Sequence, residues 1–203
     1  MVEIKVTEVL KEGLNVGIKN APSLIVATLL WILTIWIPYI NVGTTIAMCS
    51  IPVSLSKGEV LSPTFIFDAK FRKKMGDFFI LEGLMNMAIL FAMIFLIIPA
   101  YVLSYAWSQA IYLLLDKEIT STEALTMSNK LTYGYKWKLF GIDLLIFICI
   151  GLAICVLVGI ASCINDVFAL LVYTIILILS APFIMGCHGV IYRLLTTESQ
   201  TED

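Results

Sequence analysis

Residues 137–160 read WKLFGIDLLIFICIGLAICVLVGI, and this stretch decides the class of fold. Only Lys138 and Asp143 carry charge within it. A helix needs about 20 mostly apolar residues to cross the hydrocarbon core of a bilayer, and it satisfies its own backbone polar groups there. The stretch therefore predicts a membrane-spanning helix.

Five further apolar runs cover residues 21–40, 42–55, 78–98, 99–115 and 167–195. The chain is 60% hydrophobic and 14% charged, with a mean hydropathy of +0.98, whereas soluble domains average about 45–50% apolar and about 25% charged. We therefore expect an all-α fold, a single membrane domain over residues 1–203 built as a transmembrane bundle of six spans. Prolines at the turns, Pro38 and Pro99, indicate that spans one and two, and spans three and four, form hairpins.

The 13 Lys and Arg residues fall in only four segments. They lie before span one, between spans two and three, between spans four and five, and at the end of span six. With six spans, all four segments lie on one side of the membrane. The positive-inside rule makes that side cytoplasmic. We expect a multi-pass protein of the cell (cytoplasmic) membrane with both termini in the cytoplasm.

The basic segments before spans one, three and five each read as an amphipathic helix on the cytoplasmic side. In the second, Ser62 and Pro63 suit an N-cap and a first helical position, and in the third Thr120 and Glu123 suit a capping box. The apolar stripes are Val6, Leu10, Leu14 and Ile18; Phe67, Phe71 and Met75; and Ala124, Met127, Leu131 and Tyr135. Such helices can lie in the interface with lysines reaching the headgroups, or pack on neighbouring helices as caps; both arrangements stay open.

This order of amphipathic helix, span, tight turn and span suggests a threefold internal repeat over residues 1–59, 60–118 and 119–198. The ends of the three copies match loosely: Val53-Ser54-Leu55 with Glu59, Tyr112-Leu113-Leu114 with Glu118, and Tyr192-Arg193-Leu194 with Glu198. Repeats of this kind are common in membrane proteins that move substrates.

Three stretches carry a family resemblance: Lys11-Glu12-Gly13, then Leu55-Ser56-Lys57-Gly58-Glu59, then the region 98–137. The third contains Ile98-Pro99-Ala100-Tyr101, Tyr105, Leu115-Asp116-Lys117-Glu118, Glu123-Ala124-Leu125 with Ser128, and Gly134-Tyr135-Lys136-Trp137. The chain resembles bacterial six-span integral membrane proteins of unknown function, related to the membrane domain of some glycerophosphodiester phosphodiesterases. The resemblance implies a helical bundle. Hydrolysis in the fused proteins belongs to a separate soluble domain, so it does not carry over to this chain.

Polar residues inside spans are the first candidates for a functional site, because ionisable groups are costly there. Glu82 and Asp143 lie about one turn into spans three and five, and Asn86 follows Glu82 at i+4. His188, the only histidine, lies in span six. The four side chains could line one polar cavity. Alternatively, the carboxylates pair with lysines or a helix N-terminus near the interface, and His188 is an ordinary hydrogen-bonded interior residue.

A short basic stretch precedes span three and consists of Lys70, Arg72, Lys73 and Lys74. Each such charge beside a membrane attracts anionic lipid by about 1 kcal/mol, so we expect contact with lipid headgroups and not with nucleic acid. The single histidine and the five cysteines show no metal-ligand spacing, and no cofactor is expected.

Together these features predict a non-enzymatic membrane protein, since no catalytic motif is found. The first hypothesis is that it binds or moves a small or lipidic solute within the helices. The alternative is a scaffold or accessory subunit that organises lipids or other membrane proteins, with a membrane-protein partner or a second copy of this chain.

Overall fold

The computed structural model describes residues 4–199. Within that range every regular element is a helix, which confirms the all-α prediction. The elements are α1 (Val6–Thr34), α2 (Ile40–Ser56), the 3-10 helix η1 (Pro63–Phe67), α3 (Ala69–Lys73), α4 (Met75–Phe95), α5 (Ile97–Ala106), α6 (Ala110–Lys117), α7 (Ser121–Leu131), α8 (Lys136–Ser162) and α9 (Asp166–Ser199).

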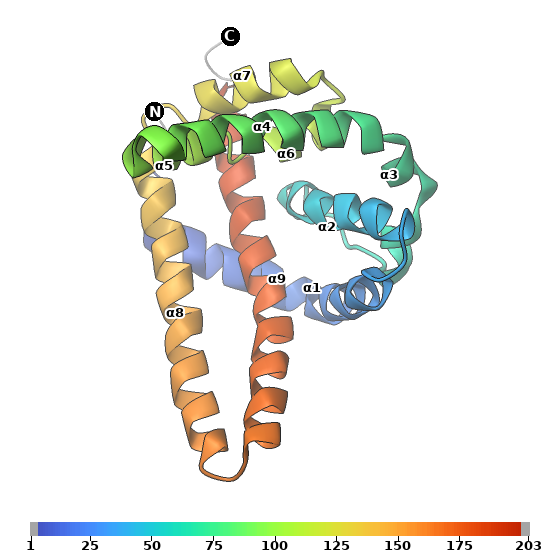
Figure 1. The fold of residues 1–203 in the computed structure, drawn as a ribbon, viewed down its shortest axis with the longest axis vertical. Helices are drawn as coiled ribbons and strands as arrows, with labels where there is room; N and C mark the ends of the chain where they lie inside the picture. Colours follow the sequence, from blue (N-terminus) through green and yellow to red (C-terminus); the bar gives the residue numbers. More distant parts are fainter. Residues whose placement is uncertain (1–3, 200–203) are drawn as a thin grey trace.

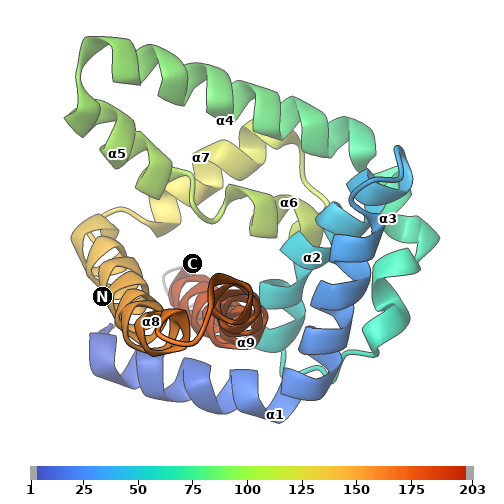
Figure 2. The same ribbon diagram turned by 60° about the horizontal axis from the view of Figure 1, so that its bottom comes forward.

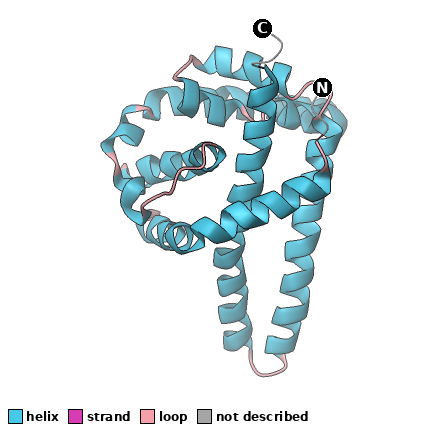
Figure 3. Cartoon of the chain, turned by 180° about the vertical axis from the view of Figure 1, so that it is seen from behind, coloured by secondary structure: helices cyan, strands magenta, loops and turns pink. Residues whose placement is uncertain are grey.

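The longest helices, α8 and α9, form an antiparallel hairpin (Figure 1). Helices α1 to α7 gather around the C-terminal half of α9, and the remaining part of the hairpin projects beyond them (Figures 1 and 3). Side chains on the projecting part remain uncovered: Phe147, Val167 and Leu170 are between 64% and 77% exposed. Apolar surface of this extent suits contact with lipid and not with water.

Five helices within residues 4–199 are long and apolar enough to cross a membrane. They are Val6–Thr34, Met75–Phe95, Ile97–Lys117 (α5 and α6 counted together across their short break), Lys136–Ser162 and Asp166–Thr197. The expected second span, α2, has 17 residues and is shorter than these. Seen along the hairpin, α1, α2, α4 and α5 lie around it and run across its direction (Figure 2). Five candidate spans are therefore found within residues 4–199 where hydropathy suggested six, and the helices around the hairpin cross it instead of running beside it.

Helix α1 is continuous, so the expected first amphipathic helix and first span are one element. The expected apolar stripe is also not its buried face, because Leu14 and Ile18 are 45% and 63% exposed. Gly13 and Gly17 are buried instead. Glycine is favoured on this face because it lets the backbone of α1 approach that of α9. Helix α1 bends along its length (Figure 2), as expected from its internal Pro22.

Of the other two predicted amphipathic helices, one is interrupted and one forms as expected. The second is interrupted at Asp68, which ends η1 and caps α3 by accepting a hydrogen bond from the Lys70 backbone N–H. The third forms as expected: α7 begins after Thr120, and Thr120 and Glu123 make the complete capping box.

The expected fourth span is broken between α5 and α6. The amide of Ala110 bonds to the Trp107 carbonyl, which leaves the Ala106 carbonyl without its helical partner. Two hydroxyls take that place, since Ser128 of α7 and Thr132, the residue that follows α7, donate to the Ala106 oxygen at 2.8 Å and 3.2 Å. The hairpin with α4 forms, but its turn lies at Leu96, and Pro99 belongs to the first turn of α5.

Candidate functional site

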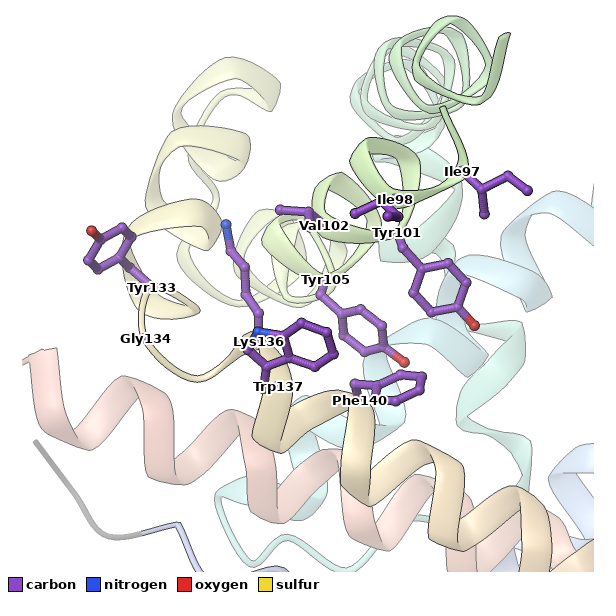
Figure 4. Close-up of a pocket in the computed structure, with 10 residues that line it drawn as sticks. All are labelled: Ile97, Ile98, Tyr101, Val102, Tyr105, Tyr133, Gly134, Lys136, Trp137 and Phe140. Atoms are coloured by element: carbon purple, nitrogen blue, oxygen red, sulfur yellow. The ribbon is translucent and has the colours of Figure 1, made fainter. Parts of the chain in front are cut away.

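A pocket of about 480 Å³ lies between α5 and the beginning of α8 (Figure 4). Its wall consists mainly of apolar and aromatic side chains from these two helices, with Tyr133 and Gly134 from the turn that follows α7. The volume is typical of small-molecule sites, which are concave and mostly apolar with a few polar groups. It is therefore the leading candidate for a binding site.

Four of the five aromatic rings that line this pocket pack in one cluster. Tyr101 and Tyr105 share one face of α5, and both meet Phe140 of α8 edge-on, with ring centroids 5.8 Å and 6.0 Å away. Trp137 lies one turn before Phe140, at 6.1 Å. Edge-to-face pairs at such distances are favourable, so the rings hold α5 against α8 and keep the pocket in shape.

The turn between α7 and α8 places the last pocket residues. Gly134 has φ +84°, a left-handed conformation that glycine adopts without strain. The chain reverses there, so that Tyr133 and Lys136 reach the same pocket. Trp137 lies 83% exposed at its edge.

Polar groups mark two different sides of the pocket. In Figure 4 the Tyr101 and Tyr105 hydroxyls point past Phe140, whereas the Lys136 side chain runs away from them. The Lys136 ammonium donates to the Asn129 Oδ1 atom at 3.2 Å. Tyr105 interacts with the Asp143 carboxylate on the next turn of α8, and this contact connects the pocket to the interior of the protein.

Two of the four expected intramembrane polar residues come together behind this contact. His188 Nε2 of α9 lies 4.0 Å from Asp143 Oδ1 of α8. The ring of Tyr112 packs near the imidazole, with a centroid distance of 6.4 Å. Asp143 and His188 therefore form a pair between the two hairpin helices, next to the aromatic pocket.

The other two residues form a separate pair on α4. Asn86 Nδ2 donates to Glu82 Oε2 at 2.9 Å and to the Glu82 carbonyl at 2.8 Å. A functional role for either pair stays a prediction.

The basic stretch before α4 is partly used inside the protein. Lys74 pairs with Glu118 at 3.0 Å and donates to the Leu115 carbonyl at 3.2 Å. Arg72 packs on Gly43 and donates to the Phe67 carbonyl at 3.3 Å. Lys70 and Lys73 are the exposed members. Lys70 pairs with Asp68 at 3.6 Å and lies over the Phe71 ring, so Lys73 is the member that best keeps the freedom that headgroup contact requires. Contact of this stretch with lipid stays a prediction.

A polar cluster that the sequence analysis did not predict joins α6, α9 and the end of α2. Asp116 of α6 forms an ion pair with Lys57, the C-cap residue of α2, and accepts a hydrogen bond of 2.6 Å from the Tyr192 hydroxyl of α9. Arg193 then pairs with Glu12 of α1 at 2.6 Å. The stretches around Lys57 and Asp116 were noted in the sequence, but nothing in them showed that they meet.

Six residues of the pocket are also among those named for the family resemblance: Ile98, Tyr101, Tyr105, Gly134, Lys136 and Trp137. They are separated by a long connection in sequence, and only the fold brings them together. No group of three or more potential metal-ligating side chains occurs within residues 4–199.

Comparisons with protein-family models, with curated proteins and with solved structures each give no match. The resemblance to bacterial six-span membrane proteins therefore stays a prediction.

Proposed function

We propose that this chain is a non-enzymatic, multi-pass protein of the cytoplasmic membrane that binds a lipidic solute in the pocket between α5 and α8. The observation that carries the proposal is the pocket itself, which has aromatic walls and opens among apolar side chains. Ile97 and Ile98 at its edge are 72% and 73% exposed. In a bilayer such side chains contact hydrocarbon, so a lipidic molecule can enter without crossing water.

The distribution of charge supports a membrane position. No Lys or Arg occurs between Lys138 and Arg193, so the projecting part of the hairpin has no basic residue. The ion pair of Glu12 with Arg193 holds the beginning of α1 near the end of α9. By the positive-inside rule, the side that carries these ends and the other basic segments is cytoplasmic.

Whether the solute is only held or is also moved depends on the polar contact behind the pocket. Tyr105 lines the pocket and interacts with Asp143, and Asp143 Oδ1 lies 4.0 Å from His188 Nε2. Such a chain of polar groups inside a membrane protein is typical of substrate or ion pathways. We therefore extend the proposal from binding of the solute to its movement along these groups.

Saturable labelling by a lipid with a photoactivatable acyl chain tests the binding proposal. The protein is reconstituted in nanodiscs, irradiated and digested, and the labelled peptides are identified by mass spectrometry. We expect labelling of residues 97–105 and 133–140 that excess unlabelled lipid suppresses. Labelling of the outer faces of α4 and the projecting hairpin provides the control, because simple bilayer contact is not competed.

If excess unlabelled lipid leaves the labelling of residues 97–105 and 133–140 unchanged, as on the outer faces of α4 and the hairpin, the proposal is contradicted. The alternative, a scaffold or accessory subunit whose apolar faces meet another membrane protein or a second copy of the chain, would then be the stronger hypothesis.

A further inference from the structure

The pocket has a basic edge. Lys130, Lys136 and Lys138 lie within nine residues at the end of α7 and the beginning of α8, and no carboxylate occurs in the sequence between Glu123 and Asp143. The charge here is therefore of one sign.

Lys136 is the member of this group that lines the pocket. Its ammonium bonds to the neutral Asn129 side chain at 3.2 Å. Among the side chains that the structure describes, none with a carboxylate forms an ion pair with it. Lys138, by contrast, lies over the Tyr135 ring at 5.7 Å. The charge of Lys136 is thus available to an anion at the pocket edge.

Neighbouring aromatic residues place this edge at the membrane surface. Trp137 and Tyr133 are 83% and 76% exposed, and exposed Trp and Tyr favour the headgroup level of a bilayer. Lys136 therefore lies where a phosphate would be, and the apolar wall formed by Ile97, Tyr101 and Phe140 continues from it toward hydrocarbon.

We propose that the occupant is an anionic phospholipid of the surrounding bilayer, with one acyl chain in the α5–α8 pocket and its phosphate against Lys136. This inference rests on the proposed function and adds the headgroup charge. A zwitterionic phosphatidylcholine offers the same chain and phosphate, but its choline group would meet the same three lysines. Charge complementarity therefore favours a lipid with net negative charge.

Quenching of Trp137 fluorescence by brominated acyl chains measures this preference. The variant Trp31→Phe/Trp36→Phe/Trp107→Phe leaves Trp137 as the only tryptophan. It is placed in phosphatidylcholine nanodiscs that contain a small fraction of brominated phosphatidylglycerol or brominated phosphatidylcholine. We expect about fivefold stronger apparent binding of the brominated phosphatidylglycerol, the factor that one lysine near a membrane surface provides.

The substitution Lys136→Gln should make the apparent binding of brominated phosphatidylglycerol equal to that of brominated phosphatidylcholine. Lys73→Gln on α3 is the matched control, because Lys73 is also exposed and basic but lies outside the pocket, and it should preserve the preference. If Lys73→Gln abolishes the preference as well, general surface charge explains it and the inference is wrong.

Competition in the unmodified protein gives a second measurement that needs no tryptophan substitution. Phosphatidylglycerol should suppress photolabelling of residues 97–105 more strongly than phosphatidylcholine does. Equal suppression by the two lipids overturns the headgroup inference but leaves the proposal of lipid binding intact. If neither lipid suppresses labelling, the headgroup inference and the lipid-binding proposal are both wrong. Suppression by oleate alone would identify a free fatty acid and overturn the phospholipid.

Discussion

Gly186 of α9 lies directly against the carbonyl oxygen of Gly13 in α1, so the two helix backbones are in contact. Gly17 continues this contact one turn later, where a Cβ atom would lie 2.5 Å from the Pro182 carbonyl oxygen. Small residues allow such close approach of membrane helices, and van der Waals packing then stabilises the pair. The contact is the main attachment of α1 to the hairpin.

A side chain at Gly186 should therefore separate α1 from α9. We expect Gly186→Val to lower the free energy of unfolding by about 1–3 kcal/mol, the usual cost of overpacking. Titration with a denaturing detergent, followed by circular dichroism, measures the loss. Gly151→Val is the matched control, because a Cβ on Gly151 of α8 meets nothing within 4 Å. An equal loss in both variants would show that helix propensity, and not the contact, is responsible.

Asp116 joins three helices through Lys57 and Tyr192, and its removal should be costly. The Tyr192 residue is 1% exposed, so Asp116→Ala leaves a buried hydroxyl without its acceptor, at a cost of about 1–3 kcal/mol. Lys57→Ala should cost no more than about 1 kcal/mol, because its side chain is 51% exposed and exposed ion pairs are weak. Tyr192→Phe combined with Asp116→Ala should recover part of the loss, which a double-mutant cycle detects. Strict additivity of the two substitutions would contradict the interpretation.

The capping box of α7 predicts a dependence of stability on pH. The Glu123 carboxylate accepts a hydrogen bond from the Thr120 backbone N–H and another from the Thr120 hydroxyl, and together these hold the pKa of Glu123 below its ordinary 4.5. A carboxyl with a lowered pKa in the folded state stabilises that state above its ordinary pKa. The contribution is lost as the pH falls through the lowered value.

Glu123→Gln keeps the hydrogen-bonding shape of the box without the charge. Its stability should therefore be lower than that of the unsubstituted protein at pH 7, and the two should converge as the pH falls well below 4.5. Thr120→Ala removes the cap at every pH and should cost about 1 kcal/mol. Unfolding measured in detergent at a series of pH values checks both statements. A constant difference between Glu123→Gln and the unsubstituted protein would contradict the charge argument.

Hydropathy was sufficient to find the long apolar helices but not their directions. It counts residues along one chain, whereas the crossing of α1 over α9 depends on Gly13 meeting Gly186, more than 170 residues later. The apolar spacing of Leu14 and Ile18 was the stronger signal in the sequence, yet the glycines determine the buried face. The break at Ala106 was equally hidden, because the hydroxyls of Ser128 and Thr132 that compensate it come from α7 and the residue that follows it.

The candidate site was predictable only in parts. The energetic cost of ionisable groups inside a membrane drew attention to Asp143 and His188, and the fold places them 4.0 Å apart. The same reasoning grouped them with Glu82 and Asn86, which form their own pair on α4. The pocket was not predicted, because Tyr105 and Trp137 are ordinary aromatic residues until α5 and α8 bring them together. Only the resemblance had drawn attention to both.

Phe140 gives the last prediction, since its ring is the common partner of Tyr101 and Tyr105. Phe140→Ala removes both edge-to-face contacts, each worth about 0.5–1.5 kcal/mol, and α5 should then separate from α8 more often. We expect faster amide hydrogen exchange over residues 97–106, by about tenfold if roughly 1.4 kcal/mol of local stability is lost.

The control for this experiment is Phe147→Ala, which makes the same change on the same helix at a ring that is 75% exposed. Exchange in α5 should remain unchanged in that variant. If Phe140→Ala leaves α5 equally protected, other contacts hold the helix and the aromatic wall is not what shapes the pocket. If α5 opens and saturable lipid labelling of residues 97–105 falls with it, the shape of the pocket and its occupancy depend on the same ring.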